Sequence, residues 1–256
     1  MSRHQALDTF GRSGNPVMSD STFSKIKITS GDTMTLEGTV NKTGILLFLL
    51  ILAAIYPWNL FFQSGNPASV MLPTLIGGIG GFIMAIVTTF KKSWAPVTAP
   101  IYAVLEGLLL GGISAIFEAQ YPGIVIQATG LTFGTLASLL MLYKLGIIKP
   151  TENFRLMIVS ATMGIAILYF ISFLMNMFGS NGIGFIHSNG IFGIGFSLFV
   201  VAIAALNLVL DFDFIEQGSE QNAPKYMEWF GAFSLMVTLI WLYLEILRLL
   251  AKLRSR

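Results

Sequence analysis

The sequence predicts an all-α membrane protein built from transmembrane helices, and its composition is the first reason. Hydrophobic residues make up 54% of the 256 residues and charged residues only 11%, whereas soluble domains carry about 25% charged residues. Most charges lie in the tails and in the gaps between long apolar runs. A soluble fold could not bury so much apolar surface, so we expect the lipid bilayer to be the surroundings of this chain.

Seven apolar runs are long enough for a transmembrane helix, which needs about 20 residues to cross the hydrocarbon core. Trp58, Trp94, Trp229 and several basic residues lie near the ends of these runs, as expected for anchors at the membrane interface. We therefore predict a seven-helix transmembrane domain over residues 41–256. Its spans are expected at 43–62, 69–90, 96–117, 124–143, 156–178, 191–210 and 229–250.

Residues 1–40 are polar and rich in Ser, Thr, Gly and Asp. No apolar core follows a basic start in the first thirty residues, so we do not expect a signal peptide. This composition predicts a mostly disordered N-terminal tail. A tail that binds a partner is the alternative.

The distribution of basic residues predicts the orientation in the membrane. The gap after the second run holds Lys91 and Lys92, and the gap after the fourth holds Lys144, Lys149 and Arg155. The positive-inside rule places these gaps, and with them the N-terminus, in the cytoplasm. Seven crossings would then place the C-terminus outside.

The basic C-terminal end conflicts with that orientation. Residues 248–256 hold four basic residues, whereas the gap after the sixth run is acidic. Either the last run crosses despite its charges, or it is re-entrant and returns the C-terminus to the cytoplasm. We favour a crossing because residues 229–250 are long enough to span.

The residue inventory argues against catalysis. There is no cysteine, so thiolate chemistry and cysteine-bound zinc are excluded, and the two histidines are His4 and His187. The chain has neither a Gly-x-Ser-x-Gly elbow nor a phosphate-binding glycine loop. We expect a protein that is not an enzyme and carries no bound cofactor, and the net charge of +2 gives no indication of a nucleic-acid partner.

Four acidic residues lie in or at the ends of the apolar runs: Glu106, Asp211, Asp213 and Glu245. Charged groups in a membrane are costly and usually face a cavity, a partner or an ion path. Glu106 lies in mid-span, where it is either a neutral group bonded to a neighbouring helix or a proton-sensitive site.

The other three acidic residues have different predicted roles. Asn207 and Asp211 share one helix face because they are four residues apart, which makes Asp211 the stronger pore or pairing residue. We expect Asp213 at a solvated helix end. Glu245 either pairs with Arg248 three residues later or faces Asp211, and in the second case the two carboxylates would share a proton.

Pairs of glycines at four-residue spacing occur in three runs: Gly77 with Gly81, Gly107 with Gly111, and Gly130 with Gly134. Such pairs let helix backbones approach closely. Pro57, Pro73 and Pro100 are expected to kink their helices.

Several segments resemble the Bax inhibitor-1 (transmembrane Bax-inhibitor-motif) family, and its bacterial branch in particular. The likeness covers about residues 34–253 and lies in MTLEGTVNKTG, APIYAVLEGLLLG, NLVLDFDFIEQG and KYMEWFGAFSLMVTLIWLYLEILRLL. The resemblance implies a compact bundle with the last helix central, in a bacterial inner (plasma) membrane.

The resemblance also implies a pH-sensitive calcium leak, in which acidic residues of the sixth and seventh helices share a proton. Asp211 matches the first of these, and Glu245 stands where the family has Asp. A gapless overlay would place Leu235 or Thr238 there instead. Asp211 and Glu245 are thus the expected ligands of a transported Ca²⁺, assisted by Glu106, Asp213 and Asn207. The alternative is a non-transporting regulator that binds a membrane protease or other membrane proteins.

Overall fold

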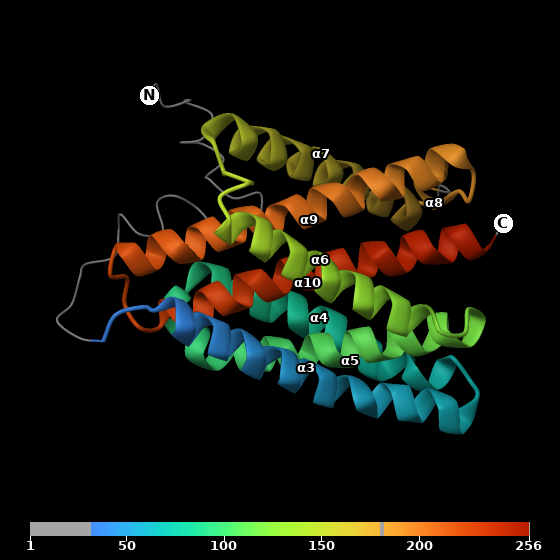
Figure 1. Ribbon diagram of the computed structural model, residues 1–256. Helices are drawn as coiled ribbons and strands as arrows, with labels where there is room; N and C mark the ends of the chain where they lie inside the picture. The colour runs from blue at the N-terminus through green and yellow to red at the C-terminus, as the bar shows by residue number, and fades with distance from the viewer. Residues whose placement is uncertain (1–31, 180–181, 256) are drawn as a thin grey trace. The chain divides into compact units, whose positions relative to one another are not determined.

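The computed structural model describes residues 32–179 and 182–255, which form seven long helices and two short ones (Figure 1). Each long helix has the length and apolar composition to cross a membrane, which confirms the predicted seven-helix architecture. The long helices are α3 Leu36–Ser64, α4 Ala68–Phe90, α5 Ala95–Gln120, α6 Ile124–Lys144, α7 Glu152–Met177, α9 Ile191–Glu220 and α10 Met227–Arg254. The short ones are η1 Lys92–Trp94 and α8 Gly184–His187.

Two helices extend well beyond one end of their predicted spans, α3 at its start and α9 at its end. α3 begins at Leu36 rather than at residue 43 because Thr35 caps it, with Thr35 Oγ1 accepting a hydrogen bond from the Gly38 N–H at 3.0 Å. Residues 36–40, expected in the tail, are therefore helical, and residues 1–31 lie outside the described residues. α9 continues to Glu220 instead of ending near residue 210.

The contacts within the chain divide it into two compact units, and α9 and α10 contribute residues to both. One unit contains residues 32–125 and 215–236. Within it, α5 packs against both α3 and α4 (Figure 1). Gly77 of α4 lies so close to α5 that a Cβ atom would come within 2.5 Å of the Leu105 carbonyl oxygen. A Cβ atom on Gly107 would come within 2.4 Å of the Leu50 carbonyl oxygen of α3. The predicted role of these glycines in close helix packing is confirmed.

In the same unit, the segment before α3 pairs with the connection between α9 and α10. The Met34 N–H donates to the Ala223 carbonyl at 2.7 Å, and the Lys225 N–H donates to the Asp32 carbonyl at 3.1 Å. Thr33 and Pro224 form an antiparallel bridge between these bonds. This pairing fixes where the chain enters α3.

The second unit contains residues 126–214 and 237–255. Its hydrophobic core joins α7 to α9 through Ile158, Ile165, Val200 and Ile203, with Trp241 of α10 packed against them. A Cβ atom added at Gly130 or Gly134 of α6 would meet nothing within 4 Å. The prediction that this pair permits close helix packing is therefore wrong.

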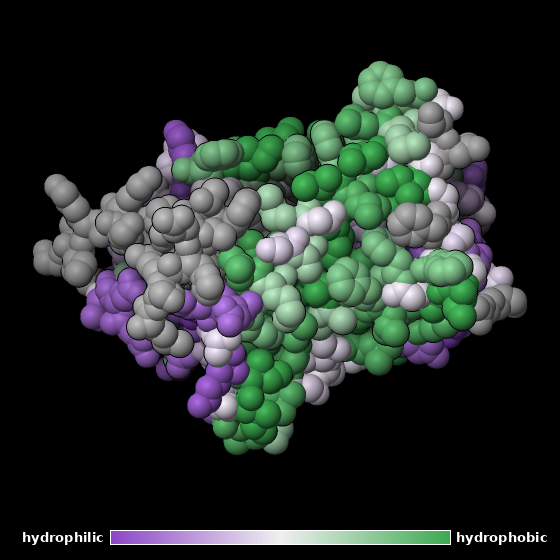
Figure 2. Space-filling model, turned by 90° about the horizontal axis from the view of Figure 1, so that it is seen from above, coloured by the Kyte–Doolittle hydropathy of each residue, from purple (hydrophilic) through white to green (hydrophobic). Residues whose placement is uncertain are grey.

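Large apolar side chains are exposed along α3, α4 and α7, as a hydrocarbon environment requires. Figure 2 shows hydrophobic residues at the surface over much of the face in view. α10 is the most buried of the seven long helices, with 72% of its apolar window inside the protein. α10 is therefore the helix whose apolar side chains are covered most within the described part of the chain.

Candidate functional site

Asp211 and Asn207 lie one turn apart on the same face of α9, as predicted. Asp211 is completely buried. The Asn207 amide nitrogen donates to Thr162 Oγ1 of α7 at 2.8 Å and to the Ile203 carbonyl at 2.9 Å. The Asn207 Oδ1 atom accepts no hydrogen bond from the described residues. The α9 face therefore presents a carboxylate and an amide oxygen inside the protein.

Because Asp211 is completely buried, its carboxylate requires compensation when it is ionised. An ionised carboxylate taken out of water is stable only when a proton, a counter-charge or hydrogen bonds compensate it. Because α9 runs on to Glu220, Asp211 lies inside the helix and not at its end. The predicted span ended at residue 210 and missed this continuation. Phe212, Phe214 and Ile215 in the continuation are all buried in the structure.

Asp213 is not the solvated helix end that the sequence predicts. Its Oδ2 atom accepts a hydrogen bond from Arg155 Nη2 of α7 at 2.7 Å, and the side chains are 14% and 11% exposed. Arg155 was expected only as an interface anchor beside a cytoplasmic gap. The ion pair thus joins α7 to α9 two residues from Asp211.

Glu245 of α10 is held from two sides. The Tyr169 hydroxyl of α7 lies 3.0 Å from Oε1 and 3.2 Å from Oε2 of the Glu245 carboxylate. Arg248 Nη1 donates to Oε1 at 2.7 Å and to the Tyr169 oxygen at 2.9 Å. The predicted pairing of Glu245 with Arg248 is confirmed, whereas proton sharing between Glu245 and Asp211 stays a prediction.

Glu106 lies in the other compact unit and is buried in mid-helix on α5. The Tyr102 hydroxyl, one turn earlier, hydrogen-bonds its carboxylate. A Cβ atom on Gly81 of α4 would come within 2.6 Å of Glu106 Oε1. The small residue at Gly81 therefore makes room for a mid-span carboxylate. Its hydrogen bond comes from Tyr102 of the same helix, whereas one of the two alternatives from the sequence was a bond to a neighbouring helix.

Glu228, which sequence reasoning missed, is a completely buried carboxylate at the first turn of α10. Its Oε1 atom accepts hydrogen bonds from the Thr35 N–H at 2.9 Å and the Thr35 hydroxyl at 2.8 Å. Lys42 of α3 and Lys225 complete its ion pairs. Lys225 lies three residues before Glu228, but Thr35 and Lys42 lie more than 180 residues from it in the chain, so local spacing could have indicated only the Lys225 pair.

Lys252 is a second buried charge that the sequence did not single out. Its ammonium donates to the Ile186 carbonyl at 2.5 Å, the Gly193 carbonyl at 3.0 Å and Ser197 Oγ at 2.8 Å. All three donated bonds go to neutral oxygens. Lys252 therefore ties the end of α10 to α8 and to the first turns of α9.

The acidic residues do not assemble into a conventional metal site. No group of three or more His, Cys, Asp or Glu side chains that could hold a metal ion occurs within residues 32–179 and 182–255. Asp211, Asp213, Glu245 and Asn207 belong to one unit and Glu106 to the other. Tight Ca²⁺ sites use six to eight oxygen ligands, and these residues do not form such a set.

Comparison with known protein families identifies a relationship. A family model described as Bax inhibitor 1 like matches residues 15–255. No curated protein and no solved structure matches the chain. The match covers nearly the whole sequence, including all seven long helices, and the chain therefore belongs to the Bax inhibitor 1 like family.

Proposed function

We propose that this protein is a cation leak channel that passes Ca²⁺ and responds to pH through membrane carboxylates. The observation that carries the proposal is Asp211, a completely buried acidic residue inside a membrane-spanning helix. Ionisable residues in such positions usually mark ion or proton pathways. Asn207 on the same face adds an amide oxygen that accepts no hydrogen bond from the described residues.

Conduction requires that an ion bind well enough to enter and weakly enough to leave. A pair of carboxylates with few further ligands meets that condition. In this proposal Asp211 attracts the cation in its ionised form and loses that attraction when it takes up a proton. Flux should therefore fall as the pH is lowered.

Glu245 is the proposed second carboxylate of the ion path. Its hydrogen-bond partners determine how readily it can bind a cation. Arg248 and Tyr169 hold its oxygens, so an arriving cation must compete with the Arg248 guanidinium. The Arg248 side chain is 38% exposed, which allows it to turn toward solvent. Glu106 of α5 is proposed as a further proton-sensitive group.

We further propose that the protein has no enzymatic activity and lies in a bacterial inner membrane with its N-terminus in the cytoplasm. The support for this orientation is the basic character of the α4–α5 and α6–α7 connections, which include Lys91, Lys92, Lys144 and Lys149.

The test is a flux measurement on the purified protein in liposomes that contain a Ca²⁺-sensitive dye. Flux is compared with protein-free liposomes at several values from about pH 5 to 8, the range in which perturbed carboxyl groups titrate. We expect Ca²⁺ entry that falls as the pH is lowered. Folded protein that passes no cation at any pH would contradict the proposal and favour a non-transporting regulator of membrane proteins.

A further inference from the structure

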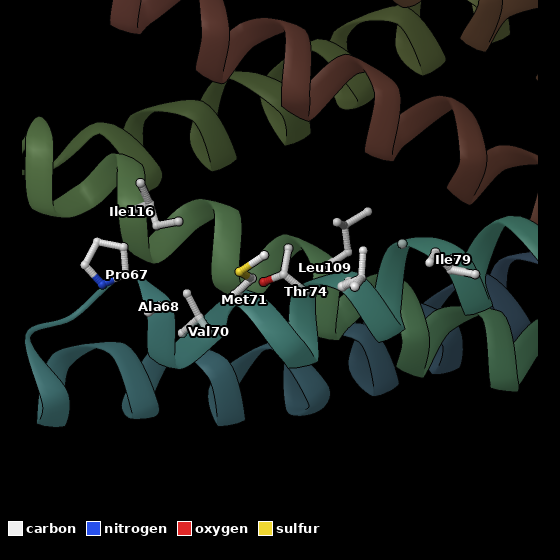
Figure 3. Close-up of a pocket in the computed structure, with 10 residues that line it drawn as sticks. Pro67, Ala68, Val70, Met71, Thr74, Ile79, Leu109 and Ile116 are labelled. Atoms are coloured by element: carbon white, nitrogen blue, oxygen red, sulfur yellow. The ribbon is translucent and has the colours of Figure 1, made fainter. Parts of the chain in front are cut away.

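An apolar groove runs along the contact between α4 and α5, within one compact unit. Its volume is about 600 Å³. Of the ten residues that line it, Thr74 is the one with a polar side chain (Figure 3). The walls come from α4 residues such as Met71 and Ile79 and from Leu109 and Ile116 of α5.

The length of the groove matches the depth of one leaflet. Its lining extends along α4 from Pro67 to Ile79, which at 1.5 Å per residue is about 18 Å. Half of a bilayer's hydrocarbon core is about 15 Å. A packed transmembrane helix would need a groove of about twice this length, so the dimensions favour a single lipid chain.

One end of the groove, lined by Pro67 and Ala68, lies at the polar α3–α4 turn. At this turn Ser64 Oγ bonds Ser69 Oγ at 2.8 Å and Asn66 Oδ1 accepts from the Ala68 N–H at 2.9 Å. Asn66 and Ser64 are exposed. No acidic or basic residue occurs between Lys42 and Lys91, and Glu118, two residues beyond Ile116 on α5, accepts hydrogen bonds from the Gly123 and Val125 N–H groups. This end of the groove therefore offers no basic residue that would select an anionic headgroup.

We propose that this groove is a binding site for one acyl chain of a membrane phospholipid, drawn from the leaflet at the α3–α4 turn. The apolar walls hold the chain and the uncharged turn lies at the level of the headgroup. Recognition therefore depends on the chain and is indifferent to headgroup charge. The site is independent of the proposed ion flux, because none of the lining residues is a proposed pore residue.

Two pairs of variants separate groove filling from a general surface effect. Met71 in the groove and Met141 on α6 are 69% and 64% exposed, so Met71→Trp and Met141→Trp make the same change at equally exposed sites. Gly78→Leu also fills the groove, since its Cβ would meet Leu109 Cδ1 at an ordinary 3.5 Å. Gly44→Leu is the control for it, because nothing lies within 4 Å of the added Cβ.

The experiment is native mass spectrometry of the full-length chain in detergent, titrated with phosphatidylcholine or phosphatidylglycerol of identical acyl chains. We expect one lipid per chain with similar affinity for both headgroups, and a loss of roughly tenfold or more, or about 1.4 kcal/mol, in Met71→Trp and Gly78→Leu. The control variants should bind like the unmodified chain. Equal binding by all variants, a strong preference for one headgroup, or a second copy of the chain in place of lipid would overturn the proposal.

Discussion

Buried charges in this protein are held by hydrogen bonds that come from other parts of the chain. Glu245 receives the hydroxyl of Tyr169 and the guanidinium of Arg248, and Lys252 donates to three neutral oxygens. A hydrogen bond to a charged group contributes about 1.5–3 kcal/mol, and leaving such a group unsatisfied costs more than the bond itself gains. These contacts explain how charged residues remain inside an apolar bundle.

Tyr169→Phe tests whether a single hydrogen bond to the buried Glu245 carboxylate stabilises the protein. It removes the hydroxyl that bonds Glu245 and leaves the ring in place, so we expect the free energy of unfolding to fall by about 1–3 kcal/mol. Denaturant unfolding in detergent micelles measures the change. Tyr56→Phe is the matched control, because Tyr56 is 60% exposed on α3, and it should change stability by no more than about 0.5 kcal/mol. Equal stability of the two variants would show that the Tyr169 hydroxyl does not support Glu245.

At the scale of the helices, α5 owes its position to glycines that bring backbones together. Gly107 and Gly111 let α3 approach so closely that added Cβ atoms would lie 2.4 and 2.3 Å from the carbonyl oxygens of Leu50 and Ala54. Backbone atoms cannot give way as a flexible side chain can. The close contact therefore depends on the absence of a Cβ atom.

Gly107→Ala should lower the free energy of unfolding by about 2 kcal/mol, because it overpacks the contact between α3 and α5. Gly130→Ala, in open space on α6, should cause no loss, since alanine favours a helix over glycine by about 0.5–1 kcal/mol. Thermal unfolding of both variants in the same detergent measures the difference. A Gly107→Ala protein as stable as Gly130→Ala would contradict the packing described for α5.

The helices show how far the sequence predicts the structure. Apolar run length was enough to place all seven spans, because crossing a bilayer imposes a minimum length on each helix. The glycine pattern alone did not predict which helices pack closely. Gly107 and Gly130 each begin a glycine pair with four-residue spacing, but only Gly107 meets a neighbouring helix. Which partner a residue meets depends on contacts between distant segments, and for the same reason the Thr35–Glu228 and Arg155–Asp213 pairs could not be predicted.

At the scale of the whole molecule, the sequence offers two alternatives for the side of the membrane on which the C-terminus lies. α10 is one continuous helix of 28 residues, or about 42 Å, which exceeds the hydrocarbon thickness of about 30 Å. With seven crossings, the α3–α4 turn and the C-terminus lie on the same side. The α4–α5 connection lies on the opposite side.

Because the chain contains no cysteine, single cysteines report this arrangement without background. In intact cells or oriented vesicles, we expect Ser64→Cys and Ser255→Cys to react with a membrane-impermeant maleimide from the same side. Ser93→Cys, beside Lys91 and Lys92, should react only from the other side. Labelling of Ser255→Cys together with Ser93→Cys would instead mean that the last helix turns back within the membrane.

The central claim is that Asp211 makes cation flux depend on pH, and Asp211→Asn tests it most directly. Asp213→Asn is the matched control, since it makes the same change two residues away at a side chain paired with Arg155. The measurement is Ca²⁺ entry into dye-loaded liposomes from about pH 5 to 8, with folding of each variant checked by its thermal unfolding. We predict that Asp211→Asn stays at the low-pH flux of the unmodified protein throughout, whereas Asp213→Asn keeps the pH response. An Asp211→Asn protein with the pH response of the unmodified chain would contradict the account.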